Sequence, residues 1–87
     1  MKCGNERKSD VIVNVEKNNL NTNRIEIESK YGDMFYENIR TLIEKHMNER
    51  QLSGFDINVK DFGAWDYAII ARLEACLIGM EADEHDA

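Results

Sequence analysis

The stretch NVKDFGAWDYAIIARLEACL, Asn58–Leu77, decides the fold of this chain because two periodicities meet within it. Leading into it and continuing to its second residue, Phe55, Ile57 and Val59 alternate with polar residues, which is typical of a strand with one buried face. After Gly63 the apolar residues recur at helical spacing instead. The stretch therefore predicts a strand, a sharp turn and an amphipathic helix, in that order.

Two further strands are predicted before this unit. Val11, Val13 and Val15 alternate with residues that point the other way, and the segment Arg24–Ser29 alternates again. The segment between them, Asn18–Asn23, is rich in asparagine, which tolerates the backbone angles of turns. This pattern favours a β-hairpin.

Another helix is predicted from about Asp33 to about Arg50. Asp33 is expected to cap its amino end, and Gly54 is expected to follow its carboxyl end with a positive φ angle. The apolar or boundary residues that recur at helical spacing are Phe35, Ile39, Leu42, Ile43, His46 and Met47.

The final helix carries more apolar residues than a core-facing stripe needs. Ile70 and Ile78 fall outside the stripe, which suits either a partner-binding surface or an ordinary apolar helix surface. Arg72 lies near the apolar side and is expected either to extend its charged group to solvent or to pair with a carboxylate such as Asp61 or Glu74. The residues expected on the stripe are Trp65, Ala68, Ile69, Arg72, Leu73, Cys76, Leu77 and Met80.

The order ββαβα predicts a small α+β fold, a two-layer sandwich with an antiparallel or mixed sheet and two helices on one face. A right-handed crossover through the first helix would make the strands on either side of it parallel. All 87 residues fit one domain. Residues 1–9 are expected to form a flexible leader and residues 81–87 a frayed acidic tail.

Charge and composition exclude several classes of function. The chain has 17 acidic and 11 basic residues and a net charge of -6, which disfavours nucleic acids and anionic membranes as partners. No apolar run reaches the ~20 residues that span a bilayer, and no signal peptide is evident, so a cytoplasmic location is expected. Cys3 and Cys76 are too few for a disulfide framework and are expected to be reduced.

The residues that usually carry catalysis or bind metals are not grouped. His46 lacks a second ligand at suitable spacing on its helix face, and His85 lies in the acidic tail, so no metal site is predicted. No nucleophile is placed beside a histidine, so no catalytic residue is predicted. The residues alone indicate a non-catalytic domain that acts through its surface or through an attached group.

Three blocks of the sequence resemble the acyl carrier protein of citrate lyase, its gamma subunit. They are SDVIVNV at Ser9–Val15, RIEIES followed by YENIRTLI at Tyr36–Ile43, and the opening stretch with its aspartate, glycine and alanine turn and its ARLEA helix. The acyl carrier subunit of malonate decarboxylase is a close relative of this family. Phe62 in the turn resembles that relative, whereas ARLEA favours citrate lyase.

The resemblance implies a carrier and not an enzyme. In the family a serine of the amino-terminal loop is joined by a phosphodiester to 2'-(5''-phosphoribosyl)-3'-dephospho-CoA, whose thiol carries acetyl and citryl groups. The implied partners are the alpha transferase subunit, the beta lyase subunit and the prosthetic-group transferase. A tether of this kind replaces diffusion between two active sites with a high effective concentration.

The chain departs from the family at the attachment position. The family's serine lies two residues before the aspartate that matches Asp10, and Lys8 occupies that place here. An amine cannot form the serine phosphodiester. Ser9, one residue later, is the only hydroxyl of the leader and is the candidate attachment residue. One alternative is an unmodified, carrier-like assembly module that binds proteins through the surface around Ile70 and Ile78. The other is the acyl carrier subunit of malonate decarboxylase.

Overall fold

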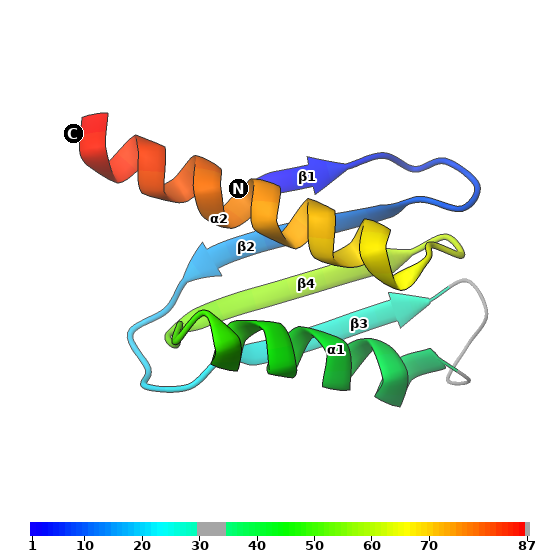
Figure 1. Cartoon of the computed structure of the whole chain (residues 1–87), viewed down its shortest axis with the longest axis horizontal. Coiled ribbons are helices and arrows are strands. Elements are labelled where there is room, and N and C mark those ends of the chain that lie inside the picture. Colours follow the sequence, from blue (N-terminus) through cyan, green and yellow to red (C-terminus); the bar gives the residue numbers. More distant parts are fainter. Residues whose placement is uncertain (30–34, 87) are drawn as a thin grey trace.

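The structure, a computed structural model, describes the backbone of residues 1–29 and 35–86 and the side chains of residues 1–29 and 35–82. A sheet of four strands is covered on one face by two helices, which confirms the predicted α+β class (Figure 1). The elements are β1 Lys2–Gly4, β2 Val11–Lys17, β3 Arg24–Ser29, α1 Tyr36–Glu49, β4 Phe55–Asp61 and α2 Asp66–Asp86. Asp33, the predicted helix cap, lies outside the described residues.

The sheet is mixed, with the strand order β1-β2-β4-β3. β4 lies between β2 and β3, antiparallel to the first and parallel to the second. The parallel arrangement of β3 and β4 confirms the predicted consequence of the crossover through α1. The predicted hairpin of β2 with β3 is wrong, because β4 separates these two strands.

The asparagines that suggested a hairpin bind the chain just before β4 instead. Asn18 donates its backbone N–H to the carbonyl of Gly54 at 2.8 Å. The Asn23 side chain donates to the carbonyl of Leu52 at 2.9 Å and accepts the N–H of Phe55 at 3.0 Å. The segment from Asn18 to Asn23 therefore passes over the start of β4 and fixes its place between the two strands.

The carboxyl end of α1 is closed by Gln51, not by Gly54. Gln51 has a φ of 55°, and its N–H bonds the carbonyl of Asn48 while that of Leu52 bonds the carbonyl of Met47, both at 3.0 Å. These two bonds form a Schellman motif, in which the left-handed residue directly follows the helix. Gly54 also has a positive φ, 84°, but it serves the turn into β4.

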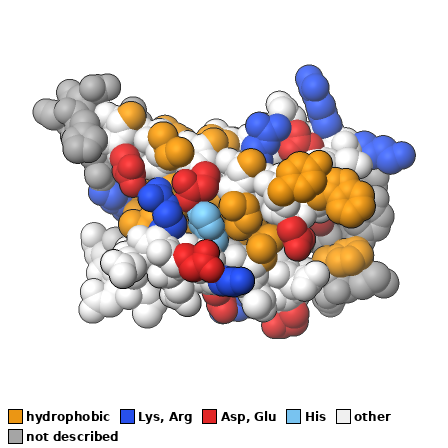
Figure 2. Space-filling view, in the orientation of Figure 1, with side chains coloured by type: hydrophobic (Ala, Val, Ile, Leu, Met, Phe, Trp, Pro, Cys, Tyr) orange, Lys and Arg blue, Asp and Glu red, His pale blue; other side chains and the backbone are white. Residues whose placement is uncertain are grey.

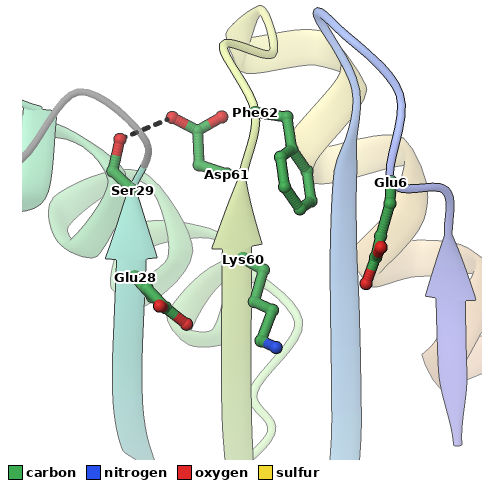
Figure 3. Close-up of a pocket in the computed structure, with 6 residues that line it drawn as sticks. All are labelled: Glu6, Glu28, Ser29, Lys60, Asp61 and Phe62. Atoms are coloured by element: carbon green, nitrogen blue, oxygen red, sulfur yellow. Dashed lines mark hydrogen bonds between the residues drawn. The ribbon is translucent and has the colours of Figure 1, made fainter.

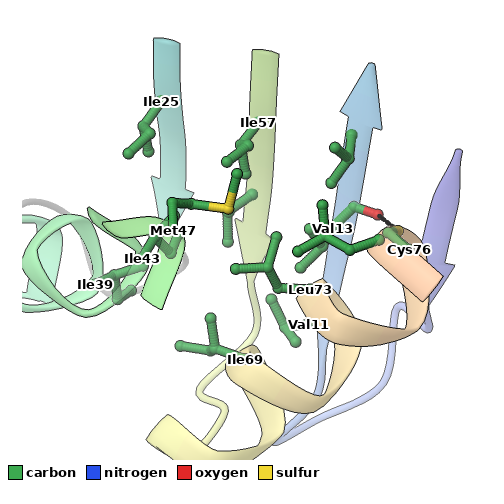
Figure 4. Packing of buried hydrophobic residues seen from close by; sticks show 13 residues of the cluster. Val11, Val13, Ile25, Ile39, Ile43, Met47, Ile57, Ile69, Leu73 and Cys76 are labelled. Carbon is green, nitrogen blue, oxygen red and sulfur yellow. Dashed lines mark hydrogen bonds between the residues drawn. The ribbon is translucent and has the colours of Figure 1, made fainter. Parts of the chain in front are cut away.

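The core lies between the sheet and the two helices (Figure 4). Trp65 was expected on the inward stripe but is 69% exposed, because α2 begins one residue later and Trp65 precedes its periodic part. Ile70 packs partly against the core, whereas Ile78 is 57% exposed. The buried cluster comprises Val11, Val13, Val15, Ile25, Ile39, Ile43, Met47, Ile57, Val59, Ile69, Leu73, Cys76 and Leu77.

Both ends of the chain hold more regular structure than the sequence indicated. Lys2–Gly4 pair with β2, so the expected absence of structure in residues 1–9 is wrong for this segment. Gly4 permits the pairing, because a Cβ at its φ of 113° would lie 1.8 Å from the carbonyl oxygen of Val11. At the other end α2 continues to Asp86, where a frayed tail was expected. Among the described residues, no helix has the length and apolarity needed to span a bilayer.

Candidate functional site

Ser9 occupies a strained position in the loop between β1 and β2. It is exposed, and its φ of 67° lies in the left-handed region. The N–H of Asp10 bonds the carbonyl of Arg7 at 3.0 Å, so Ser9 is the third residue of a tight turn. A residue with a Cβ pays about 1–2 kcal/mol for this conformation, so the surrounding contacts must hold Ser9 in place.

Two backbone hydrogen bonds fix Ser9 against the turn that leads into α2. The N–H of Ser9 bonds the carbonyl of Phe62 at 2.8 Å, and the N–H of Phe62 bonds the carbonyl of Asp10 at 3.0 Å. Figure 1 shows this loop and the start of α2 at the same end of the molecule. The turn Asp61–Ala64 therefore supports Ser9, and we call this turn the platform.

Arg72 of α2 reaches the residue directly after Ser9. Its Nη2 lies 2.9 Å from Oδ2 of Asp10 and its Nε lies 3.4 Å from Oδ1, while the N–H of Val11 also donates to Oδ1 at 2.8 Å. The Arg72 guanidinium and then the Val11 N–H hold the pKa of the Asp10 carboxyl below its usual value. The expected pairing of Arg72 with a carboxylate is confirmed, but the carboxylate is that of Asp10 and not that of Asp61 or Glu74.

Glu74 is engaged by α1 instead of by Arg72. His46 Nε2 lies 2.5 Å from Oε1 of Glu74, and Nε of Arg50 donates to the same oxygen at 2.9 Å. His46 is thus a half-buried residue at the boundary between the two helices. These contacts join α1 to α2 and bring no base to Ser9.

Asp61 is buried, with 4% of its surface exposed, and its carboxylate holds the turn that follows β4. One carboxylate oxygen accepts the N–H groups of Gly63 at 3.1 Å and Ala64 at 2.9 Å, and the other accepts the hydroxyl of Ser29 at 3.1 Å. Gly63 has a φ of 92°, which lets the chain turn sharply after β4. The role of Asp61 is therefore to position the turn.

A shallow hollow of about 440 Å³ lies on the face of the sheet that the helices leave open (Figure 3). Glu28 and Lys60, which are opposite one another in the register of β3 and β4, project into it with Phe62. Its lining carries three carboxylates, those of Glu6, Glu28 and Asp61, and one lysine, Lys60. This excess of acidic residues disfavours an anionic ligand in the hollow. Phe62 connects the hollow with Ser9 through its backbone hydrogen bonds.

The Ser9 side chain is not engaged by the described residues around it. Its hydroxyl is exposed and makes no hydrogen bond within the described part of the chain. The adjacent carboxylate, Asp10, is occupied by Arg72 and cannot serve as a free base. The exposed hydroxyl is therefore accessible from solvent.

Sequence reasoning found Ser9 but missed what holds it. Ser9 has a left-handed φ angle and bonds Phe62, which in turn bonds Asp10. These features depend on a contact between segments that are distant in the sequence. The exposed rings of Trp65 and Tyr67, 69% and 75% exposed, were also missed. A signal for Trp65 existed in its place before the first helical residue, since capping residues leave the helical stripe.

Comparison with known proteins gives one match over most of the chain. Residues 1–79 match the family described as "Malonate decarboxylase delta subunit (MdcD)", an acyl carrier protein family. No curated protein and no solved structure matches the chain. The chain therefore belongs to the malonate decarboxylase delta subunit family of acyl carrier proteins.

Proposed function

We propose that this chain is the acyl carrier subunit of a malonate decarboxylase complex and that its acyl groups travel on an arm attached to Ser9. The family match over residues 1–79 supports malonate decarboxylase, which the sequence resemblance had offered as the alternative to citrate lyase. A non-catalytic carrier role agrees with a site that contains an exposed hydroxyl and no free base.

The observation that carries the proposal is the presentation of Ser9. Ser9 is exposed and strained in a left-handed turn, and its hydroxyl makes no hydrogen bond within the described part of the chain. Such a turn makes one hydroxyl accessible to a modifying enzyme while the backbone bonds to Phe62 keep its position fixed. Gln51, which also has a positive φ, ends α1, whereas the left-handed angle of Ser9 ends no helix. Strain without such a structural role is a reason to assign Ser9 a function.

The proposed arm is 2'-(5''-phosphoribosyl)-3'-dephospho-CoA, joined to the Ser9 oxygen by a phosphodiester. Its terminal thiol would supply the thioester that activates an acyl group for exchange and decarboxylation on partner subunits. The protein's own contribution is mechanical. Asp10, Arg72 and Phe62 keep the base of the arm on a fixed platform, so that the arm sweeps a limited volume between partner active sites.

Intact-mass spectrometry tests the attachment. The chain is produced together with the enzymes that make and transfer the arm, beside the variants Ser9→Ala and Lys8→Ala. We expect the mass of the arm on the natural chain and on Lys8→Ala, and its absence from Ser9→Ala. An arm on Ser9→Ala, or a natural chain that stays unmodified under these conditions, would overturn the proposal.

A citrate lyase complex is the second candidate, because the block ARLEA at Ala71–Ala75 resembles that family's helix. The two candidates differ in the acyl group exchanged onto the arm. The acetylated carrier is incubated with the transferase subunit and either malonate or citrate, and the carrier's mass is measured. A malonyl adduct supports the first candidate, and a citryl adduct replaces it with the second.

An experiment can also distinguish the unmodified assembly module from the two carrier candidates. The module would bind its partners through Ile78, which is 57% exposed on α2. If Ser9 is never modified and Ile78→Asp prevents assembly with the partner subunits, the chain is an assembly module. If Ile78→Asp leaves assembly unchanged, that alternative is wrong.

A further inference from the structure

Two large aromatic side chains stand in solvent at the start of α2. Trp65 and Tyr67 are 69% and 75% exposed, the highest values among the large hydrophobic residues of the described chain. Figure 2 shows hydrophobic side chains gathered over this part of the helix. Neither side chain forms a hydrogen bond or ring contact within the described residues, so both rings are free to bind a flat partner group.

Two cations lie on the loop that carries Ser9. Arg7 and Lys8 are exposed, and neither forms an ion pair with any described residue. The nearby carboxylates are Glu6 in the same loop, Asp66 in the first turn of α2, and Asp10, which Arg72 already neutralises. Free cations at this end contrast with a chain whose net charge is -6.

The aromatic residues and the cations both belong to segments that meet at Ser9. The N–H of Ser9 bonds the carbonyl of Phe62 at 2.8 Å. Trp65 follows Phe62 by three residues, so the Cα atoms of Phe62 and Trp65 are at most about 11 Å apart. Arg7 and Lys8 are the two residues directly before Ser9. A group attached at Ser9 therefore reaches both the rings and the cations.

We infer that Trp65 and Tyr67 with Arg7 and Lys8 form a binding surface for the adenosine pyrophosphate portion of the arm. This inference rests on the proposed function, because the arm brings that portion to Ser9. A purine ring stacks on an exposed aromatic side chain, and exposed guanidinium and ammonium groups neutralise phosphates. Tethering supplies the high effective concentration that makes a weak site occupied.

The consequence for the carrier is that the mobile part of the arm becomes shorter. With its nucleotide held on the surface beside Ser9, only the pantetheine segment swings, and the thiol explores a smaller volume. The surface would also orient the nucleotide during its transfer. In that step the Ser9 oxygen attacks the 5''-phosphate of an activated donor and displaces the donor's leaving group.

The single tryptophan of the chain makes the inference measurable without any activity. The protein is prepared without the modifying enzymes, so that it carries no arm, and is titrated with free 3'-dephospho-CoA. We expect saturable quenching of the Trp65 fluorescence that weakens as salt is raised. 4'-Phosphopantetheine, which lacks the adenosine, should quench much less. Equal effects of the two compounds, or no saturable effect, would overturn the inference.

Matched variants separate the rings from the cations. Binding of 3'-dephospho-CoA is then followed by calorimetry, because Trp65→Leu removes the fluorophore. We expect Trp65→Leu to weaken binding at least about fivefold and Lys8→Glu to weaken it about two- to fivefold. Lys45→Glu, at an exposed position of α1, is the control and should leave binding unchanged. A Lys45→Glu effect equal to that of Lys8→Glu would indicate unspecific charge attraction and overturn the site.

The same variants decide whether a protein occupies this surface instead. If Trp65→Leu leaves 3'-dephospho-CoA binding unchanged but abolishes the complex with the transferase subunit, the surface is a protein interface and the inference is wrong. Failure here does not affect the proposed function, because intact mass reports the arm on Ser9 independently. Conversely, an unmodified Ser9 with intact 3'-dephospho-CoA binding would refute the carrier and retain a nucleotide site.

Discussion

The guanidinium of Arg72 donates to the carboxylate of Asp10, the residue directly after Ser9, with Nη2 2.9 Å from Oδ2. The two residues are 62 positions apart in the sequence, so the contact ties the last helix to the first loop. Phe62 completes the connection through its two backbone bonds to Ser9 and Asp10. The position of Ser9 therefore depends on β4 and α2, which lie at the other end of the chain.

Breaking this pair should impair modification more than folding. Arg72→Leu leaves the Asp10 carboxylate with hydrogen bonds from the Val11 N–H and the Asn5 side chain, and removes its ion pair with α2. Because the pair is partly exposed, we expect only a small drop in the urea midpoint but a several-fold slower transfer of the arm to Ser9. Arg72→Lys keeps the charge and should show an intermediate rate. Equal transfer rates in all three proteins would contradict a positioning role.

The strain at Ser9 should appear in stability. A glycine accepts a φ of 67° without the clash that a Cβ causes, whereas alanine does not. We expect Ser9→Gly to be more stable than Ser9→Ala by about 1 kcal/mol in urea unfolding. Neither variant can carry the arm, so the comparison is free of modification. If the two variants unfold at the same urea concentration, Ser9 is not strained in solution.

The free energy of unfolding should fall at acid pH because of Asp56. Two bonds from Arg24, Nε to Oδ1 at 2.8 Å and Nη2 to Oδ2 at 2.7 Å, together with the Asn18 amide, lower the Asp56 pKa to about 2. A lowered pKa contributes stability that is full above the ordinary value of 3.8 and is lost as the pH falls toward 2.

Urea unfolding between pH 5 and about 2 measures this contribution. Asp56→Asn should be less stable than the natural chain at the upper end, and the difference should shrink as the pH falls. Glu37→Gln, an exposed substitution on α1, controls for the change in net charge. A difference that is constant over the whole range would show that the carboxylate charge of Asp56 contributes nothing.

Cys76 should be chemically inert in the folded chain. It is fully buried, and burial together with the neighbouring Cys3 thiol raises the Cys76 pKa to about 12. In a Cys3→Ser variant, iodoacetamide at mildly alkaline pH should label Cys76 only after urea is added. Labelling of the folded variant at the rate seen in urea would contradict the burial of this thiol.

Local patterns predicted most elements, and non-local contacts explain the errors. The alternation of Ile57 and Val59 and the helical spacing of Ile69 and Leu73 report burial, which the structure confirms. The hairpin was wrong because the bonding partners of Asn23, at Leu52 and Phe55, lie about thirty residues away and cannot be read from a turn-forming sequence. β1 has three residues, too few for a visible alternation.

The candidate site was predictable only as a residue type. Ser9 could be named because it is the only hydroxyl before β2. Its left-handed backbone, the bond from its N–H to Phe62 and the pairing of Arg72 with Asp10 arise when the two ends of the chain meet. The sequence offered Asp61 and Glu74 as partners of Arg72 because both are near in sequence, but Asp61 is used by the turn and Glu74 by His46.

Peptide mapping of the modified protein tests the central claim most directly. Trypsin cuts after Lys8 and Lys17, and the peptide Ser9–Lys17 contains Ser9 as its only hydroxyl-bearing residue. We predict that the arm is found on this peptide, or on its extension through Lys8 if the arm blocks cleavage there, and that fragmentation places it on Ser9. An unmodified Ser9–Lys17 peptide from a protein that carries the arm elsewhere, or fragmentation that places the arm on Lys8, would contradict the account.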